Sequence, residues 1–422
     1  MLRKIVNTFS TRAITAVINL LIAVVLSRYL GPEGKGVQSL IITTITLVLV
    51  FANLVGGATL VYLVPRHAPS LLVLPSYAWT LLIALFSYFI LRIFPLVDPS
   101  FTLHICVLSV LNSIAAINTS ILTGKEKIST ANLIGLIQPV VLIIALLSAF
   151  IILDNPQIRD YIFSLYISFG LSAVVSIFFY VRFCGKIKIH TTAEYGRVMR
   201  ELVRFGILNQ VAHITQMLSF RLSFYVLDRF HGEAAVGIYS NGISLAESIW
   251  LISKSISLVQ YARISNTDNR KEAASLTTKL IKFSVLASLA LLIPLAALPA
   301  SFYSWIFGEG FEQIRLVIWT LSLGVLVYNF SILIGHYFSG TGRYYINAVS
   351  SSLGLVASVV LYFTLIPAFG ITGAGWATSA SYLVTTMILV YIFNKENKGW
   401  HKELALSRDD WKRIKSWRKT AA

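Results

Sequence analysis

Charged residues are scarce in this sequence of 422 residues. Only 13% of them are Asp, Glu, Lys or Arg, whereas 56% are hydrophobic. Soluble globular domains contain about 25% charged residues, so this composition does not supply a water-exposed surface. The mean hydropathy of +0.75 indicates that lipid surrounds most of the chain. The composition therefore predicts an integral membrane protein and excludes an ordinary soluble enzyme.

The sequence has only two cysteines, and it lacks metal-ligand patterns and long polar connections. Cys106 and Cys184 show neither metal-ligand nor redox spacing, and the seven histidines show no metal spacing. No run matches the Gly-x-x-x-x-Gly-Lys-Ser/Thr phosphate loop of ATP-driven pumps. The connections leave no room for a catalytic domain. The sequence thus predicts no metal, no cofactor and no enzymatic activity.

Twelve apolar segments are long enough to cross a bilayer, which takes about 20 helical residues. The start of the chain has a basic pair before an apolar run, as in a signal peptide, but Arg12 interrupts the run and no small-residue cleavage site follows. We therefore expect an all-α membrane protein of about twelve transmembrane helices. The segments lie near residues 5–30, 37–64, 71–95, 100–123, 129–153, 159–183, 202–230, 235–262, 276–306, 312–339, 344–366 and 371–393.

Basic residues are unevenly distributed over the connections. With the N-terminus assigned to the cytoplasm, the inner side holds 26 of the 35 Lys and Arg residues and the outer side holds 6. Positively charged connections face the cytoplasm, so both termini are predicted to be cytoplasmic. This excess explains the net charge of +17 without a nucleic-acid partner. The other three basic residues, Arg12, Arg221 and Lys254, fall inside predicted helices.

The C-terminal tail, residues 394–422, interleaves basic residues with Trp400, Trp411 and Trp417. Aromatic rings at headgroup level and cations near anionic lipid are typical of membrane interfaces. The tail is therefore predicted to lie on the membrane lipids at the cytoplasmic surface, and a binding site for a partner protein is the alternative.

The two halves of the sequence share a motif at an offset of 201 residues. Residues 27–39 align without gaps on residues 228–240, at the predicted outer end of the first helix of each half. A second similarity relates residues 124–127 to residues 340–343, at the inner end of the fourth helix of each half. The alternative is that Arg-x-x-Gly is only a common helix-end signal. The identical pairs of the first motif are Arg28/Arg229, Gly31/Gly232, Gly36/Gly237 and Ser39/Ser240.

This repeat predicts the organisation of the chain. Because an even number of helices, six, separates the copies, both halves have the same orientation and are related by a pseudo-two-fold axis along the membrane normal. We expect a six-helix lobe at 1–184, a basic cytoplasmic linker at 185–201, a second six-helix lobe at 202–393, and the tail. Such repeats are typical of transporters, whose substrate sites lie between the lobes.

The end of the first helix resembles the polysaccharide-transporter, or O-antigen flippase, family of the multidrug/oligosaccharidyl-lipid/polysaccharide exporter superfamily. The resemblance implies movement of undecaprenyl-pyrophosphate-linked sugar units across the bacterial cytoplasmic membrane, for surface polysaccharides such as the O-antigen of lipopolysaccharide. A lipid-linked oligosaccharide is then the substrate, and a polysaccharide polymerase or glycosyltransferases are possible partners. The motif that carries the resemblance is Leu26-Ser27-Arg28-Tyr29-Leu30-Gly31-Pro32-Glu33-Gly34-Lys35-Gly36.

Polar and ionisable side chains inside the predicted helices point to a central cavity, because a charge within the bilayer must face water or a partner. They form one polar face on each of the first, seventh and eighth helices, by the helical spacing of 100° per residue. The repeat places His213 opposite Arg12. The predicted substrate-binding residues are Arg12, Asn19, Gln210, His213, Arg221, Glu247 and Lys254.

Each of these residues also has a structural interpretation. Arg12 and Lys254 can reach the cytoplasmic headgroups, His213 can bond between packed helices, and Arg221 can pair with Glu247. Fixed cations with few acids suit a pyrophosphate, since Arg binds phosphate bidentately and Lys acts as a point charge. An ion-coupled drug exporter of the same superfamily and a membrane polysaccharide polymerase or transferase remain the alternatives.

Overall fold

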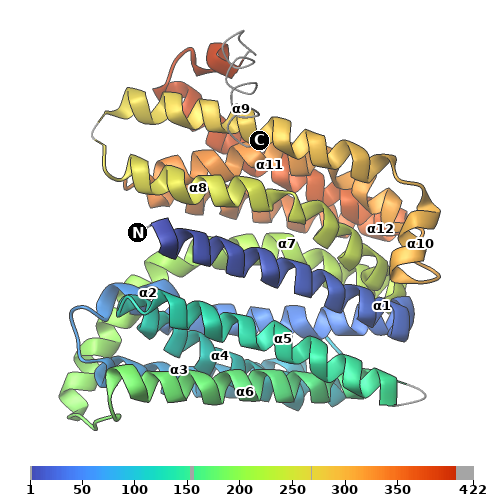
Figure 1. Ribbon diagram of the computed structural model, residues 1–422. Coiled ribbons are helices and arrows are strands. Elements are labelled where there is room, and N and C mark those ends of the chain that lie inside the picture. Colours follow the sequence, from blue (N-terminus) through green and yellow to red (C-terminus); the bar gives the residue numbers. More distant parts are fainter. Residues whose placement is uncertain (1, 153–155, 268, 405–422) are drawn as a thin grey trace.

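The computed structural model describes residues 2–152, 156–267 and 269–404, and every regular element in this part of the chain is helical (Figure 1). Eight of the described helices are long and apolar enough to cross a membrane. The number is nine if α7 (Thr192–Ser248) and α8 (Trp250–Ile264), which meet at a bend of 43°, form one broken span. The predicted all-α membrane fold is confirmed.

Three of the long helices each consist of two arms that meet at a glycine: α1 (Leu2–Ala52), α7 and α12 (Tyr344–Glu396). The glycines are Gly31, Gly232 and Gly370, with φ of 66°, 78° and 56°. Only glycine enters this left-handed region without a steric cost. Figure 1 shows the second arm of α1 returning beside the first. Counting both arms of each gives the twelve spans predicted from the sequence.

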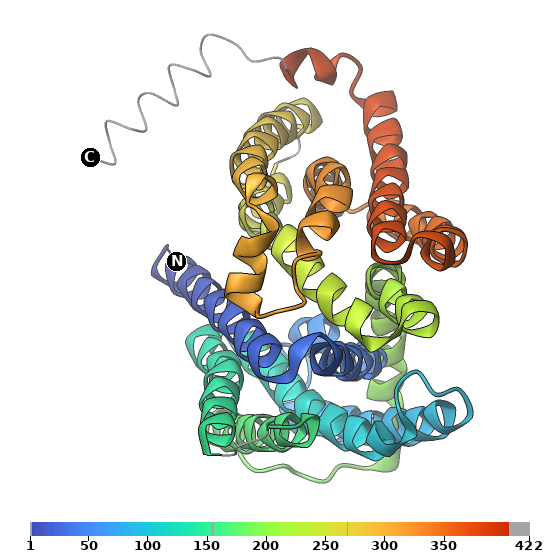
Figure 2. The same ribbon diagram turned by 90° about the vertical axis from the view of Figure 1, so that its right-hand side faces the viewer.

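The remaining elements complete two groups of helices, which we call the first lobe (α1–α6) and the second lobe (α7–α12). Viewed end-on, the arms of α1 and α7 lie in the middle, and the other helices of each lobe lie on opposite sides of them (Figure 2). The first lobe has η1 (Asn53–Val55), α2 (Gly57–Leu63), α3 (Pro69–Ile93), η2 (Pro99–Phe101), α4 (Thr102–Gly124), α5 (Ile128–Ile152) and α6 (Ile158–Cys184). The second lobe has α9 (Arg270–Ala297), α10 (Ala300–Phe307) and α11 (Ile314–Gly340), followed by η3 (Trp400–Leu404).

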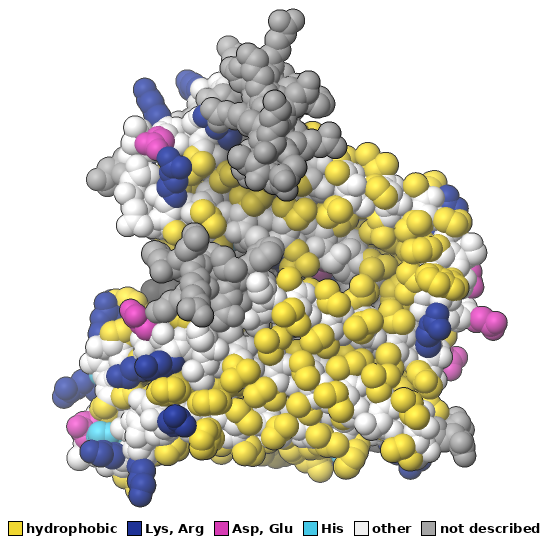
Figure 3. Space-filling model, viewed as in Figure 1, with side chains coloured by type: hydrophobic (Ala, Val, Ile, Leu, Met, Phe, Trp, Pro, Cys, Tyr) yellow, Lys and Arg dark blue, Asp and Glu magenta, His cyan; other side chains and the backbone are white. Residues whose placement is uncertain are grey.

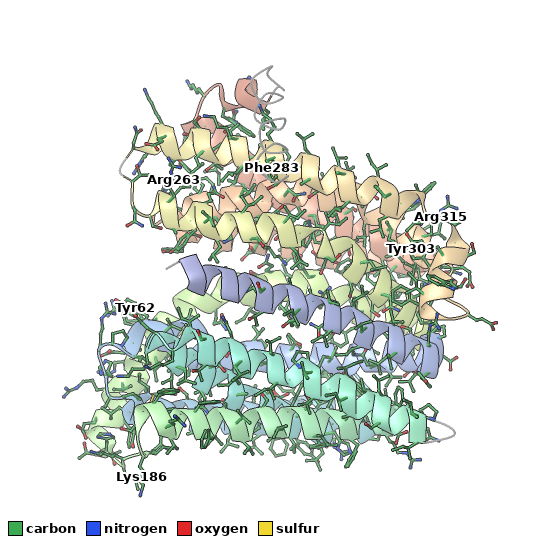
Figure 4. The ribbon with its side chains drawn as sticks, viewed as in Figure 1. Tyr62, Lys186, Arg263, Phe283, Tyr303 and Arg315 are labelled. Carbon is green, nitrogen blue, oxygen red and sulfur yellow. The ribbon has the colours of Figure 1, made fainter. Side chains whose placement is uncertain are left out.

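The two ends of the bundle differ in charge. Lys186 and Arg263 lie at one end, and Arg315 and Tyr303 lie at the other (Figure 4). Lys and Arg side chains gather at the end that holds Lys186 and Arg263 (Figure 3). We call this the basic end, and we call the opposite end, where the arms of α1 turn at Gly31, the glycine end. Apolar side chains cover the surface between the two ends, as a membrane-spanning protein requires.

The beginning of α7 differs from the sequence-based boundary at residue 202. The helix starts at Thr192, because Thr191 and Glu194 form a capping box in which each side chain bonds to the other's backbone N–H. Val198 and Leu202 are buried in the apolar core of the first lobe. Most of the predicted linker is thus a helix packed on the first lobe. The Thr-x-x-Glu spacing that starts this helix was present in the sequence.

The C-terminal tail is described only as far as Leu404. Trp400 is buried, and its ring contacts those of Phe393 and Phe330 in the second lobe. The first tryptophan of the tail therefore anchors α12 to its own lobe. Trp411 and Trp417, which carry most of the predicted interfacial character, lie outside the described residues.

Contacts on the axis between the lobes are symmetric. A Cβ on Gly36 would lie 1.8 Å from the carbonyl oxygen of Glu233, and a Cβ on Gly237 would lie 2.0 Å from that of Pro32. These two contacts are exchanged by the offset of 201 residues. Ser39 Oγ lies 2.8 Å from Ser240 Oγ, so these two repeat-related residues bond to each other. Direct contact between equivalent residues is the mark of a two-fold axis.

The second sequence similarity also corresponds to matching contacts. Gly124, at the end of α4, packs against Val64, and Gly340, at the end of α11, packs against Ile264. In each lobe the fourth spanning helix therefore ends on the last turn of the second. The two lobes therefore share this contact.

Candidate functional site

The site lies where α1 and α7 meet, and at the glycine end these helices are closely joined. Asn241 Nδ2 donates to Ser27 Oγ at 2.7 Å, next to the Ser39–Ser240 hydrogen bond. One and a half turns further into the bundle, Thr44 Oγ1 lies 2.9 Å from the hydroxyl of Tyr225. We call these three hydrogen bonds the interlobe seal. They close the glycine end of the boundary between the lobes.

Lys35, counted from sequence among the outer basic residues, is buried beside this seal and is only 7% exposed. Its Nζ donates to Ser39 Oγ at 3.1 Å and to the side-chain carbonyl of Gln38. Gln38 Nε2 in turn donates to the hydroxyl of Tyr161 at 3.1 Å. The lysine thus belongs to the packing of α1 and α6. The sequence signal was its spacing of four residues from Ser39, which puts both on one helix face.

Arg221 and Glu247 form an ion pair just inside the seal. Arg221 Nη2 lies 2.9 Å from Glu247 Oε2, and the hydroxyl of Tyr382 donates to Glu247 Oε1 at 2.8 Å. Arg221 is one helical turn from Tyr225, whose hydroxyl belongs to the seal. The pair is therefore placed at the closed end of the boundary between the lobes. Its side chains retain 29% and 13% exposure.

Aromatic rings hold this ion pair in place. The rings of Trp250, Tyr328 and Tyr382 are in mutual contact, with centroid separations of 4.7 to 5.3 Å. The hydroxyl of Tyr328 accepts a hydrogen bond from Gln216 Nε2 at 2.6 Å. This cluster draws on α7, α8, α11 and α12, and it positions Tyr382, which bonds to Glu247.

One donor atom of Arg221 has no hydrogen-bond partner among the described residues. Its Nη1 is buried and makes no hydrogen bond within the described residues. A guanidinium group carries five N–H donors in a planar fork, and an Arg–carboxylate pair is commonly bidentate. Here Tyr382 bonds to Oε1 of Glu247, and Arg221 bonds to Oε2 through Nη2 only. The guanidinium therefore keeps donor capacity for another anion.

The other predicted site residues lie along the same boundary toward the basic end. Gln210 Nε2 donates to the backbone carbonyl of Val50 at 3.1 Å, which links α7 to the second arm of α1. Arg12, Asn19 and His213 are exposed, and none of them has a hydrogen bond or ion pair in the part of the chain that the structure describes. The surface is recessed along this boundary (Figure 3).

Lys254 is the third basic residue that the sequence placed inside a span. It is exposed, its Nζ lies 5.5 Å from the centroid of the Trp250 ring, and it is within range of the charges of Glu247 and Arg221. The structure thus brings Arg221, Glu247 and Lys254 together on the second lobe. Arg12 and Asn19 are on the first arm of α1, which belongs to the first lobe.

Arg28 makes a link between the lobes that sequence reasoning missed. Its Nε donates to the carbonyl of Ile306 at 2.8 Å, and its Nη2 donates to that of Trp305. These carbonyls are at the C-terminal end of α10, where the partial negative charge of a helix attracts a cation. The repeat identified Arg28 as special, but only the fold shows that it binds α10.

Replacing Arg28 by Ala is expected to open the glycine end more often. Hydrogen bonds to a charged group contribute about 1.5 to 3 kcal/mol each, so losing two should raise the open population by about tenfold or more. A cysteine introduced as Asn241→Cys, with Cys106 and Cys184 replaced by Ser, reports this opening through its rate of reaction with a hydrophilic maleimide. Arg92→Ala is the control, because within the described residues the Arg92 guanidinium interacts with the ring of its neighbour Tyr88 on the same helix and makes no link between the lobes. Equal rates in the Arg28 and Arg92 variants would contradict the proposed link.

Comparison with known proteins gives a family match for this chain. A family model described as polysaccharide biosynthesis protein matches residues 1–266. The capsular polysaccharide biosynthesis protein CapF of Staphylococcus aureus is 24% identical over 173 residues, which are 40% of this chain and 44% of that protein. The match thus spans less than half the length of this curated relative.

Solved structures with the same fold are membrane transporters. The lipid II flippase MurJ in an inward closed conformation has a TM-score of 0.76 at 15% identity, covering 94% of this chain and 91% of that one. An inward-facing multidrug resistance transporter of the MATE family has a TM-score of 0.67 at 12% identity, covering 92% and 96%. The overall fold of the chain is therefore shared with transporters.

Proposed function

Because this chain belongs to the polysaccharide biosynthesis protein family, within the multidrug/oligosaccharidyl-lipid/polysaccharide exporter superfamily, we propose that it is a flippase for lipid-linked oligosaccharides. In this proposal an undecaprenyl-pyrophosphate-linked oligosaccharide moves from the inner to the outer leaflet of the bacterial cytoplasmic membrane. The product serves the synthesis of a surface polysaccharide such as a capsule or O-antigen. The protein acts as a transporter and performs no chemistry on the sugar.

The observation that carries this proposal is the buried Nη1 of the partly exposed Arg221, which has no hydrogen-bond partner among the described residues and lies at the boundary between the lobes. A pyrophosphate is a strong, multiply charged acceptor, and Arg and Lys are the side chains that bind it. Arg12 and Lys254 supply further positive charge on the two sides of the boundary. In the proposal these three residues bind the pyrophosphate, while Asn19, Gln210 and His213 face the sugars. The lipid tail stays in the bilayer.

The two lobes supply the movement in this proposal. The interlobe seal closes the glycine end, and the pseudo-two-fold arrangement allows one lobe to rock against the other. The basic end faces the cytoplasm according to the distribution of Lys and Arg. The substrate then enters from the cytoplasmic leaflet, and opening of the seal releases it outward. Both chain termini are at the cytoplasmic face, where a polymerase or glycosyltransferase can bind.

An ion-coupled exporter is the second candidate, favoured by the carboxylate of Glu247 inside the bundle and by the fold shared with a multidrug transporter. Deletion of the gene separates the two candidates. Loss of surface polysaccharide, with full-length lipid-linked units accumulating on the cytoplasmic side, supports the flippase. Normal polysaccharide together with increased sensitivity to cationic drugs supports the exporter.

Complementation of the deletion strain tests the predicted cations. We expect Arg12→Ala and Lys254→Ala each to lower surface polysaccharide by about tenfold at equal protein abundance, because each charged hydrogen bond to phosphate contributes about 1.5 to 3 kcal/mol. Lys186→Ala is the control, since Lys186 is a basic residue on a connection outside the bundle. Wild-type levels of surface polysaccharide in both variants would show that Arg12 and Lys254 do not bind the substrate.

A further inference from the structure

Glu247 lies beside Arg221, the residue proposed to bind the substrate's pyrophosphate. Arg221 and Glu247 both belong to α7, on its two arms, so the pair stays intact when the lobes move as bodies. The hydroxyl of Tyr382 fixes Oε1 of Glu247. The carboxylate is therefore a permanent part of the Arg221 environment, and any incoming anion meets it there.

Two features show that the carboxylate does not use all the hydrogen-bond donors of Arg221. Arg221 contacts the carboxylate through Nη2 alone, and its buried Nη1 is unsatisfied within the described residues. Removing water from a charged donor without supplying an acceptor is costly. A phosphate oxygen beside Nη1 would satisfy it, but it would also bring a second negative charge within a few ångströms of Glu247.

We propose that Glu247 acts as an internal competitor of the substrate's pyrophosphate for Arg221. In the empty protein Glu247 neutralises the guanidinium of Arg221. In the loaded protein the pyrophosphate binds the same guanidinium and is repelled by Glu247. The carboxylate thereby weakens binding and allows release on the far side of the membrane. Glu247 is a positioning residue for Arg221, and this inference rests on the proposed function.

Binding of a short polyprenyl pyrophosphate to the full-length protein tests the inference. Farnesyl pyrophosphate is titrated into protein in nanodiscs of uncharged lipid, and the dissociation constant is measured by calorimetry. Glu247→Gln keeps the shape and the acceptor for Tyr382 but removes the charge, so we expect binding to tighten by about tenfold. Glu247→Asp keeps the charge and should bind within about threefold of the wild type.

The controls separate the charge of Glu247 from other effects. Glu272→Gln removes an equivalent charge from an exposed pair with Arg263, 3.1 Å long, and should leave binding unchanged. Arg221→Gln should weaken binding, and adding Glu247→Gln to it should produce no further tightening, because the competition needs the guanidinium. Farnesol, which has the tail without phosphates, should bind equally to the wild type and Glu247→Gln.

The outcomes distinguish failure of this inference from failure of the proposed function. If the wild type binds farnesyl pyrophosphate and a folded Glu247→Gln variant binds it equally or more weakly, the competitor role is wrong and the flippase proposal stands. If the wild type binds farnesol as tightly as farnesyl pyrophosphate, the site does not recognise phosphate, and both proposals are overturned.

Discussion

Substituting valine for Gly36 is expected to keep the lobes apart at the glycine end. A Cβ at this position would lie 1.8 Å from the carbonyl oxygen of Glu233 and 2.5 Å from the carbonyl carbon. Both are backbone atoms of α7, so no side-chain rotation relieves the clash. The reporter is Ser240→Cys in a protein with Cys106 and Cys184 replaced. Its reaction with a hydrophilic maleimide should accelerate by more than about tenfold, since the seal costs more than about 1.4 kcal/mol to break.

The repeat supplies a second test of the same contact. Gly237→Val should have the same effect, because its Cβ would lie 2.0 Å from the carbonyl oxygen of Pro32. Gly135→Val in α5 is the control, as no neighbouring atom lies within 4 Å of a Cβ there. Slow labelling of Ser240→Cys in folded Gly36→Val protein would show that the lobes do not meet as described.

Replacing Arg221 by Ala is expected to abolish export and to destabilise the protein. The substitution leaves the carboxylate of Glu247 largely buried without its cation, a change that typically costs about 3 to 5 kcal/mol. Adding Glu247→Ala removes the stranded charge and should recover most of the stability, whereas export should remain lost because the phosphate-binding cation is still missing. Thermal unfolding in detergent and surface polysaccharide measure the two effects separately.

The matched control for this pair is Arg263→Ala. Arg263 and Glu272 also form an ion pair, but both side chains are more than half exposed. Exposed pairs contribute about 0 to 1 kcal/mol, so we expect little change in stability and normal export. Recovery of export in the Arg221→Ala, Glu247→Ala protein would assign Arg221 a purely structural role.

Local patterns in the sequence predicted most of the architecture. The twelve spans follow from apolar runs of membrane length, and the turns at Gly31 and Gly232 follow from the repeated motif. The hydrogen bond between Ser39 and Ser240 joins two residues that the repeat offset of 201 made equivalent. The Arg221–Glu247 pair was one of two interpretations that the sequence left open, and the structure shows the pair.

Contacts between residues far apart in the chain were not predictable. Arg28 binds α10 across 278 residues, and Tyr382 reaches Glu247 across 135. Such partners are decided by helix packing, for which a single sequence holds no periodic signal. The sequence predicted one helix at 276–306, and this was wrong for a related reason. In the structure α9 ends at Ala297 and a separate helix, α10, begins at Ala300 after Pro299. The apolar run continues through this break, so composition alone concealed it.

The interlobe seal includes a hydrogen bond between repeat-related residues of the two lobes, but the charged residues of the site are not repeated. Subtracting the repeat offset from Arg221 and Glu247 leads to Leu20 and Thr46, so the first lobe has no copy of the ion pair. The ion pair therefore belongs to the second lobe alone, whereas the first lobe contributes Arg12 to the boundary. A phosphate bound at Arg221 would stay on the second lobe throughout the transport cycle. Movement of the first lobe would expose the bound phosphate first to one side of the membrane and then to the other.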